Sequence, residues 1–391
     1  MSRLGLYEQI DAAVCAALGD IAGQHAAGLD VSAAVPAKDA LHGDVCVTAA
    51  LRAARELGLA PRALAEHLAQ ALLTCEMVEG AQVAGSGFVN LTLSQTALRA
   101  GLRPDALAPH KPKAARPLLC LCQNPQDNRQ LWSAQAVARL AAQSGATAQF
   151  VAQPADVAPE AMEAPLARLV GPDKAFGAAS PAEWAQLCQD GARLQAALGG
   201  AQEVIFFASR GAKFRPGLFE ALLGQDAPDL RCKALGAMAM GPPLLPPQEQ
   251  LARLYVLAHR PEAALDVTQK PYLRPDQGNP AFVMQYAASK LAGLAAASQH
   301  AGAEGPWPSE QRRLALHLAY FPQVLDLANR RAEPHRLGQF LAQVAQMLLA
   351  ARQAAQKRGE KAICPAVIGA CEVVFSRGFA ILGTTPLDEI T

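Results

Sequence analysis

Long apolar runs are missing from this chain, although 51% of its residues are hydrophobic. No stretch reaches about 18 consecutive apolar residues, the minimum for a helix that crosses a bilayer. The first twenty residues, MSRLGLYEQIDAAVCAALGD, contain no apolar core followed by a small-residue cleavage site, so they do not resemble a secretory signal. We therefore expect a cytoplasmic protein without a membrane partner.

A strong net charge is also missing, because 35 Lys and Arg face 34 Asp and Glu, for a formal net charge of +1. This balance argues against a protein that coats nucleic acid through bulk electrostatics. Charge is unevenly distributed, however, with nine Lys or Arg against three Asp or Glu between Gln311 and Lys361. That segment is either a solvated helical face or a surface that follows phosphates.

Recognisable catalytic and metal-binding motifs are absent from the sequence as well. No Walker loop, GxGxxG, HExxH or GxSxG pattern occurs. Nine cysteines without regular spacing are typical of reduced thiols in a cytosolic protein. Cys120 and Cys122 would share one side of a strand, but no His or Cys pair accompanies them. We expect no metal site.

Helical periodicity is strongest in the last third of the chain. Six apolar residues recur at helical spacing after Glu333-Pro334: Leu337, Phe340, Leu341, Val344, Ala345 and Leu348. A second helix is predicted from Pro365 to Gly383, and another over 314–322, ended by its proline. Three or more amphipathic helices with short connections predict a helical bundle.

The first hundred residues predict a small α+β module. Helices are expected over 4–24, within 42–58 and within 60–73. The segment 78–94, VEGAQVAGSGFVNLTLS, alternates around a Gly-Ser centre and predicts a β-hairpin. A basic, proline-containing stretch over 103–113 then predicts a linker.

The middle of the chain predicts a nucleotide-binding type of sheet. RPLLCLCQN is an apolar strand, RQLWSAQAVARLAAQSG is a helix that closes on Gly145, and TAQFVA is a second strand. VIFFAS is a further buried strand, and a helix is expected at RPGLFEALLGQ. Strand–helix–strand order is the opening of a doubly wound α/β fold.

Four segments resemble arginyl-tRNA synthetases in order and spacing. They are HGD with AGSGFVNLTLS, NPAFVMQYAASK, FPQVLDLANRRAEPHRLGQFLAQVA, and SRGFAILGTTPLDEI. The resemblance implies an α/β multidomain protein with a small α+β N-terminal domain, a reduced doubly wound core and a C-terminal all-α bundle of the DALR anticodon-binding type. It implies an N-terminal domain over 1–101, a linker over 102–116, a degenerate catalytic-like domain over 117–246 and an anticodon-binding domain over 247–391.

In that family the N-terminal domain contacts the tRNA elbow, and the matching reader positions are Phe88 and Asn90. Residues at i and i+2 of a strand face the same side, so the ring can stack on a base while the amide bonds its edge. The alternative interpretation is a core Phe88 and a turn-stabilising Asn90.

The resemblance also implies tRNA contacts on the helical bundle, at Gln285, Tyr286, Lys290, Arg336 and Arg352. Val283 replaces one family tyrosine, and Lys290 replaces an arginine, which keeps the charge but loses the bidentate fork. Leu348, Ala351 and Arg352 stand where the family carries aromatic residues that hold anticodon bases. These departures affect base reading more than binding of the tRNA backbone. Alternatively, this is a structural helix on which Tyr286 merely packs.

Three catalytic signatures of the family are absent. The strand-to-helix turn over 124–129 contains no histidine of the HIGH motif, and Ser209, Arg210 and Gly211 replace a tandem-histidine segment. The stretch LGAMAMGPPLLPPQEQ, at the place of the KMSKS-type loop, contains no lysine or serine. A loop that clamps phosphates needs cationic charge. We therefore predict no catalytic residue and no cofactor.

Three functions follow from this reading. The first is a protein that binds tRNA, with tRNA-Arg as the candidate, without aminoacylating it. The second is an active arginine–tRNA ligase that uses ATP with divergent motifs. The third is a regulatory or interaction subunit that has dropped RNA and binds a protein partner.

Overall fold

The computed structural model describes residues 4–22, 34–37, 42–109, 118–122, 127–143, 148–151, 202–210, 229–241, 244–298, 305–360 and 362–387. The chain forms two compact units. The first unit comprises 1–108, 287–323 and 343–375, and the second unit comprises 109–286, 324–342 and 376–391. The four domain boundaries implied by the family resemblance stay a prediction.

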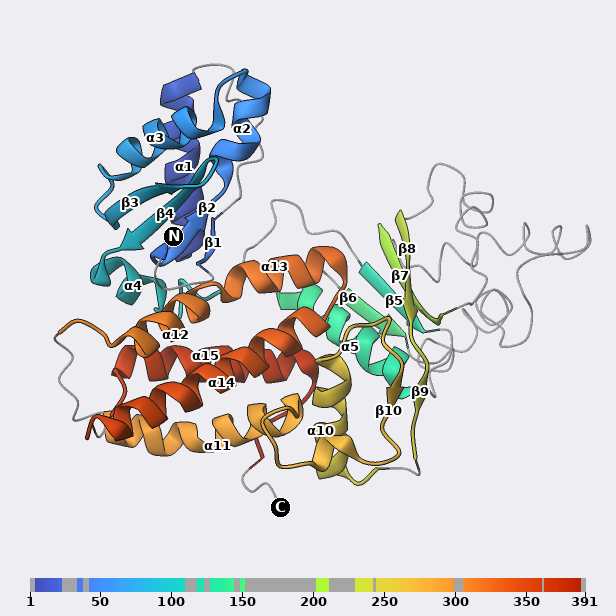
Figure 1. Cartoon of the computed structure of the whole chain (residues 1–391). Coiled ribbons are helices and arrows are strands. Elements are labelled where there is room, and N and C mark those ends of the chain that lie inside the picture. The colour runs from blue at the N-terminus through green and yellow to red at the C-terminus, as the bar shows by residue number, and fades with distance from the viewer. Residues whose placement is uncertain are drawn as a thin grey trace, which may run out of the picture. The chain divides into compact units, whose positions relative to one another are not determined.

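The N-terminal part of the first unit is an antiparallel sheet covered by helices (Figure 1). Its strands run in the order β1-β2-β4-β3, with the bounds β1 Ala34–Pro36, β2 Val45–Val47, β3 Val78–Ala84 and β4 Phe88–Leu93. Its helices are α1 Leu6–Ala22, α2 Ala49–Leu57, α3 Pro61–Leu72 and α4 Gln95–Gly101. The core is apolar, since Tyr7, Leu64, Leu68, Val89 and Leu91 are all fully buried.

The predicted hairpin, the first helix and a helix within 42–58 are confirmed, and the structure adds a strand before that second helix. Val45–Val47 is a strand that pairs with β4, and the helix begins only at Ala49. Gly43 has a φ of 82°, which breaks a helix there, and Val45 and Val47 alternate with half-buried Cys46 on the sheet. Strand β1 was not predicted.

The second unit contains a four-stranded parallel sheet. Its order is β6-β5-β7-β8, with the bounds β5 Leu118–Cys122, β6 Ala148–Val151, β7 Glu203–Ser209 and β8 Asp229–Leu235. Helix α5, Asn128–Gln143, follows β5 and leads to β6. The predicted doubly wound topology is confirmed. The helix expected at RPGLFEALLGQ and the stretch 153–200 lie outside the described residues.

Strand β8 was missed because its sequence, DLRCKAL, carries three charged residues. Arg231 and Lys233 suit an edge strand, where charge discourages pairing with another chain. Beyond it, β9 Met238–Ala239 and β10 Leu265–Asp266 form a short parallel pair.

Helices dominate the remainder of the described chain. Their bounds are α10 Pro246–Leu257, α11 Pro280–Ser298, α12 Ser309–Ala319, α13 Phe321–Arg331, α14 His335–Lys357 and α15 Pro365–Leu382, with a 3₁₀ helix η5 at Pro271–Leu273. The predicted apolar stripe on α14 is confirmed, because all six of its residues are at most 4% exposed. Helix α15 ends as expected before Gly383, which has a φ of 74°.

The expectation that Pro322 ends a helix is wrong. Helix α12 already stops at Ala319, and Pro322 is the second residue of α13. The first turn of a helix tolerates proline because its backbone N–H groups have no intrahelical partner. The start of the predicted linker also differs from expectation, since Leu102, Ala106 and Leu107 are buried.

Among the described helices, α15 alone is long and apolar enough to cross a membrane by length and composition, with a mean hydropathy of 1.5. The fold itself buries 56% of this helix. A core helix of a soluble protein passes the same test, so α15 is weak support for a membrane span.

Candidate nucleic-acid interface

Strand β4 presents the first pair of predicted RNA-contacting residues. Phe88 begins the strand and is 38% exposed, whereas Asn90 is only 9% exposed. Asn90 lies between Gln82 on β3 and Cys46 on β2. The Phe88 ring is therefore available for stacking, and the Asn90 side chain is largely enclosed by the sheet.

Tight glycine turns position Phe88. Gly87 has a φ of 150°, and a Cβ at this residue would stand 3.0 Å from the Pro61 carbonyl oxygen. Only glycine allows this close approach of the hairpin to the start of α3. The turn thus fixes where β4 begins and where the aromatic ring emerges.

Helices α11 and α14 bring Lys290 and Arg352 together. Both side chains line a hollow of about 340 Å³, which we call the α11–α14 hollow. Its lining residues are Ser289, Lys290, Gly293, Leu294, Ala297, Arg352, Ala355, Gln356, Glu360, Ala362 and Ile363. The hollow exists because Gly293, Ala297 and Ala355 leave space between the two helices, with polar groups at the rim. The one carboxylate of the lining, Glu360, pairs with Arg358. Lys290 and Arg352 therefore leave the hollow with an excess of positive charge, which suits an anionic ligand.

Tyr286 lies one helical turn before Lys290 and is partly exposed. Its ring stacks on Phe282 at a centroid distance of 5.6 Å and an interplanar angle of 12°. Val283, at the position of the second family tyrosine, is 2% exposed and belongs to the core.

Gln285, one of the predicted tRNA-contacting residues, is hydrogen-bonded within the fold. It is fully buried, and its Nε2 donates to the Thr385 carbonyl at 2.9 Å. Its Oε1 accepts a hydrogen bond from the Leu387 N–H at 2.9 Å. Both ends of the amide therefore hold the segment that follows α15.

Arg336 is also engaged within the fold. Its Nε pairs with Glu333 Oε2 at 2.5 Å, and Glu333 Oε1 lies 3.7 Å from Lys233 Nζ. Burial alone would raise the pKa of Glu333, but Arg336 and Lys233 hold that pKa below its usual value. Arg336 does not line the α11–α14 hollow.

The carboxyl ends of β5 and β7 form the edge at which doubly wound folds bind nucleotides. Arg129, near the start of α5, is 2% exposed there. Its guanidinium donates to the carbonyls of Gly236 at 2.8 Å, Ala263 at 2.6 Å and Arg260 at 2.9 Å. Burial lowers its pKa. This arginine is committed to main-chain oxygens.

Polar side chains beside Arg129 bond mainly to one another. Gln130 Nε2 donates to Asp127 Oδ2 and to Ser209 Oγ, both at 3.1 Å. The second Asp127 oxygen accepts the Arg129 backbone N–H at 2.9 Å. A carboxylate at this edge would repel the phosphates of a nucleotide. Residues 123–126 and 211–228, which include the rest of the turn, lie outside the described residues.

The described part of the chain contains no group of three or more His, Cys, Asp or Glu that could hold a metal ion. The cysteines with described side chains form no disulfide: Cys15, Cys46, Cys75, Cys120, Cys232, Cys364 and Cys371.

Comparison with known proteins gives the N-terminal region a family. Residues 8–93 match the model of the arginyl tRNA synthetase N terminal domain. An arginine–tRNA ligase of Cereibacter sphaeroides is 43% identical over 94 residues, 23% of this chain and 16% of that protein. A Bradyrhizobium arginine–tRNA ligase is 43% identical over 97 residues, 24% of this chain and 16% of that protein. The matched region thus spans about a sixth of these relatives' length.

Solved structures share the fold of the chain well beyond that region. Thermus thermophilus arginyl-tRNA synthetase superposes with a TM-score of 0.69 at 16% identity, covering 97% of this chain and 99% of that one. The Plasmodium falciparum enzyme gives a TM-score of 0.65 at 9% identity, with full coverage of both chains. Residues 8–93 are therefore similar to the N-terminal domain of arginyl-tRNA synthetases, and the chain shares the fold of the solved arginyl-tRNA synthetase structures.

Proposed function

We propose that this protein binds tRNA, with tRNA-Arg as the first candidate, and does not aminoacylate it. The observation that carries the proposal is the α11–α14 hollow, where Lys290 and Arg352 face one space on a helical bundle. The exposed Phe88 ring adds a stacking surface on the N-terminal domain. Cations that position the backbone and an aromatic ring that stacks on a base are the usual components of an RNA site.

The proposal omits catalysis because the signature cations are missing from the sequence. The turn over 124–129 and the stretch 235–250 supply neither the family's histidines nor its lysines. Arg129, the buried cation at the sheet edge, donates to three main-chain carbonyls. Neutralising a triphosphate during adenylation requires preorganised positive charge that these groups do not supply.

The binding half of the proposal is tested with single substitutions in the hollow. We expect Lys290→Ala and Arg352→Ala each to weaken tRNA affinity about tenfold, as for one charge-assisted contact. Phe88→Ala should weaken it as well, since stacking on a base contributes roughly 1–3 kcal/mol. Lys357→Ala is the matched control, because it removes an exposed cation from the same helix outside the hollow. Equal losses for Lys357→Ala and Lys290→Ala would contradict a site in the hollow.

The catalytic half is tested by arginine-dependent pyrophosphate exchange with ATP. We expect none above background under conditions that support a control arginine–tRNA ligase. Exchange would favour the alternative of an active ligase with divergent motifs. Absence of both exchange and tRNA binding would favour the second alternative, a regulatory or interaction subunit with a protein partner.

A further inference from the structure

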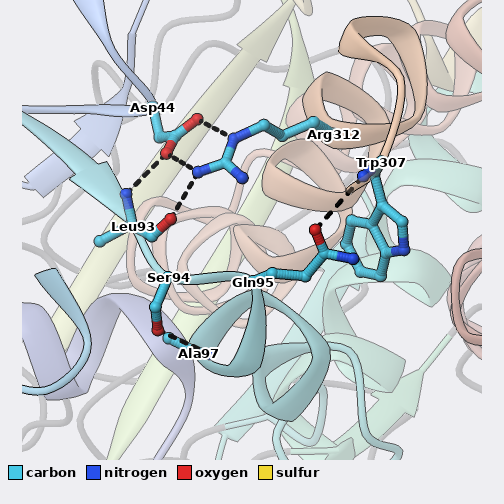
Figure 2. A network of polar contacts seen from close by, with 7 residues as sticks. All are labelled: Asp44, Leu93, Ser94, Gln95, Ala97, Trp307 and Arg312. Carbon is cyan, nitrogen blue, oxygen red and sulfur yellow. Dashed lines mark hydrogen bonds and ion pairs between the residues drawn. The ribbon is translucent and has the colours of Figure 1, made fainter. Parts of the chain in front are cut away.

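Figure 2 shows a buried ion pair between the N-terminal sheet and helix α12 within the first unit. Arg312 Nε donates to Asp44 Oδ1 at 2.7 Å, and Arg312 Nη2 donates to Asp44 Oδ2 at 2.5 Å. The same Nη2 donates to the Leu93 carbonyl at 2.5 Å. The side chains are only 22% and 8% exposed, respectively. This fork geometry is specific to arginine.

The acidic partner is fixed by the strand that carries Phe88. Asp44 Oδ2 accepts the Leu93 N–H at 2.7 Å, and the Asp44 N–H donates to the Leu91 carbonyl at 2.8 Å. A Cβ on Gly43 would stand 2.8 Å from that Leu91 oxygen, so glycine is required before the aspartate. The Asp44 carboxylate is thus hydrogen-bonded to the end of β4, and Arg312 binds both this carboxylate and the Leu93 carbonyl.

A second row of contacts flanks the ion pair. Gln95 on α4 donates to the Gly305 carbonyl at 2.5 Å. Its side-chain oxygen accepts the Trp307 N–H at 3.2 Å, as Figure 2 shows. The Arg99 guanidinium lies 5.0 Å from the centroid of the Trp307 ring. Tyr7 of α1 donates to the Leu316 carbonyl at 3.3 Å and is fully buried. Residues 305–316 are therefore contacted from α1, from α4 and from Asp44.

We propose that Asp44 and Arg312 form a lock that holds strand β4 at a fixed spacing from the α11–α14 hollow. The lock makes Phe88, Lys290 and Arg352 parts of one bivalent surface for a single folded RNA. Both ends of this surface belong to the first unit, since residues 1–108, 287–323 and 343–375 cluster together. This inference rests on the proposed function. Arg312 and Asp44 act here as positioning residues and do not touch the RNA.

A fixed spacing makes the surface bind a whole tRNA more tightly than a fragment that reaches only one end. An RNA that reaches both ends binds the second end intramolecularly, so its affinity exceeds that of a fragment by a factor on the order of 10²–10⁴. When the spacing is loose, the effective concentration of the second end falls and the advantage shrinks. The ratio of whole-tRNA affinity to stem–loop affinity therefore measures how firmly the spacing between the two ends is held, independently of how well either end binds.

The test compares a whole tRNA-Arg transcript with its isolated anticodon stem–loop. For the wild type we expect the whole transcript to bind at least about 100-fold more tightly. Arg312→Ala should reduce this ratio about tenfold or more, with the stem–loop affinity unchanged. Arg312→Lys, which keeps the charge without the fork, should retain part of the ratio. Arg313→Ala is the matched control, since it removes the exposed neighbour on the same helix.

Amide hydrogen exchange tests, without RNA, whether the Asp44–Arg312 pair stabilises the elements that it joins. We expect Arg312→Ala to speed exchange at the end of β4, in α4 and in α12, and to leave the buried stripe of α14 protected. An unchanged affinity ratio together with unchanged exchange would overturn the lock. If the wild type bound neither RNA, the bivalent surface would fall with the proposed function, while faster exchange in Arg312→Ala would still establish the structural lock.

Discussion

Arg129 lies at the sheet edge where doubly wound folds bind nucleotides, but its guanidinium is bonded to main-chain carbonyls. The residue stands at the carboxyl end of the parallel strands, where a phosphate-binding cation would be useful. Its guanidinium instead ties α5 to main-chain oxygens at 236, 260 and 263. At this position, arginine acts as an internal cross-link.

We expect Arg129→Met to lower the free energy of unfolding by about 3 kcal/mol or more, because the carbonyls of Gly236, Arg260 and Ala263 lose their donor. Urea denaturation followed by circular dichroism measures this loss. Arg62→Met is the control, since Arg62 is exposed and its surface ion pair with Glu66 is worth at most about 1 kcal/mol. A loss below about 1 kcal/mol for Arg129→Met would contradict the cross-link.

His317 on α12 gives the first unit a dependence on acid. Burial lowers its pKa from 6.5 to about 4, so the folded state keeps the ring neutral. As the pH falls below 6.5 the unfolded chain takes up the proton first, and stability is lost progressively down to about pH 4.

The comparison with His317→Gln isolates this titration from all the others. We expect the wild type to lose about 3 kcal/mol of stability relative to the variant between pH 7 and pH 4. Urea midpoints at half-unit pH steps measure the difference. A difference that stays constant with pH would show that His317 is not buried as the structure has it.

At the scale of elements, close packing of α14 depends on a glycine. A Cβ on Gly338 would stand 2.6 Å from the Leu257 carbonyl oxygen and 2.8 Å from Ala258 Cα. The helix can therefore approach the end of α10 only without a side chain at this position. Gly369 in α15 is different, because nothing lies within 4 Å of its Cβ position.

These two glycines make a matched pair of substitutions. We expect Gly338→Ala to destabilise the protein by about 1–3 kcal/mol through overpacking. Gly369→Ala should stabilise it by about 0.5–1 kcal/mol, because alanine loses less backbone entropy in a helix. Thermal unfolding of both variants checks the signs. Equal shifts in the two melting temperatures would argue against the close α10–α14 approach.

Elements with regular periodicity were predictable from the sequence, and those with interrupted patterns were not. The stripe on α14, the β3–β4 hairpin and the parallel strand β5 followed from spacing alone. Strand β8 was hidden by Arg231 and Lys233, and the division between α12 and α13 was hidden because only Tyr320 separates them. Local pattern does not report which strand lies at an edge or where two helices meet.

The candidate site was predictable only in part, for a related reason. Phe88, Lys290 and Arg352 were proposed through the resemblance to arginyl-tRNA synthetases, and the structure places the two cations in one hollow. The partners of Arg129 are main-chain carbonyls more than 100 residues away. The bonds of Gln285 to Thr385 and Leu387, and the pairing of Asp44 with Arg312, are equally non-local. Contacts of this kind leave no trace in a local motif.

At the scale of the whole molecule, the chain combines an N-terminal region similar to the arginyl-tRNA synthetase N-terminal domain with a fold shared with solved arginyl-tRNA synthetases. Its near-zero net charge means that any RNA affinity must come from local cations. We therefore expect phosphate contacts to be concentrated at the α11–α14 hollow. The stretch 235–250, which contains no lysine, should contribute none.

The most direct measurement is tRNA affinity across a series of salt concentrations for the wild type and the Lys290→Ala/Arg352→Ala double variant. We expect the logarithm of the wild-type binding constant to fall linearly with the logarithm of the salt concentration. The double variant should bind more weakly, with a slope smaller by about two, one for each lost phosphate contact. Absence of wild-type binding at low salt, or an unchanged slope in the double variant, would contradict a tRNA-binding role at the α11–α14 hollow.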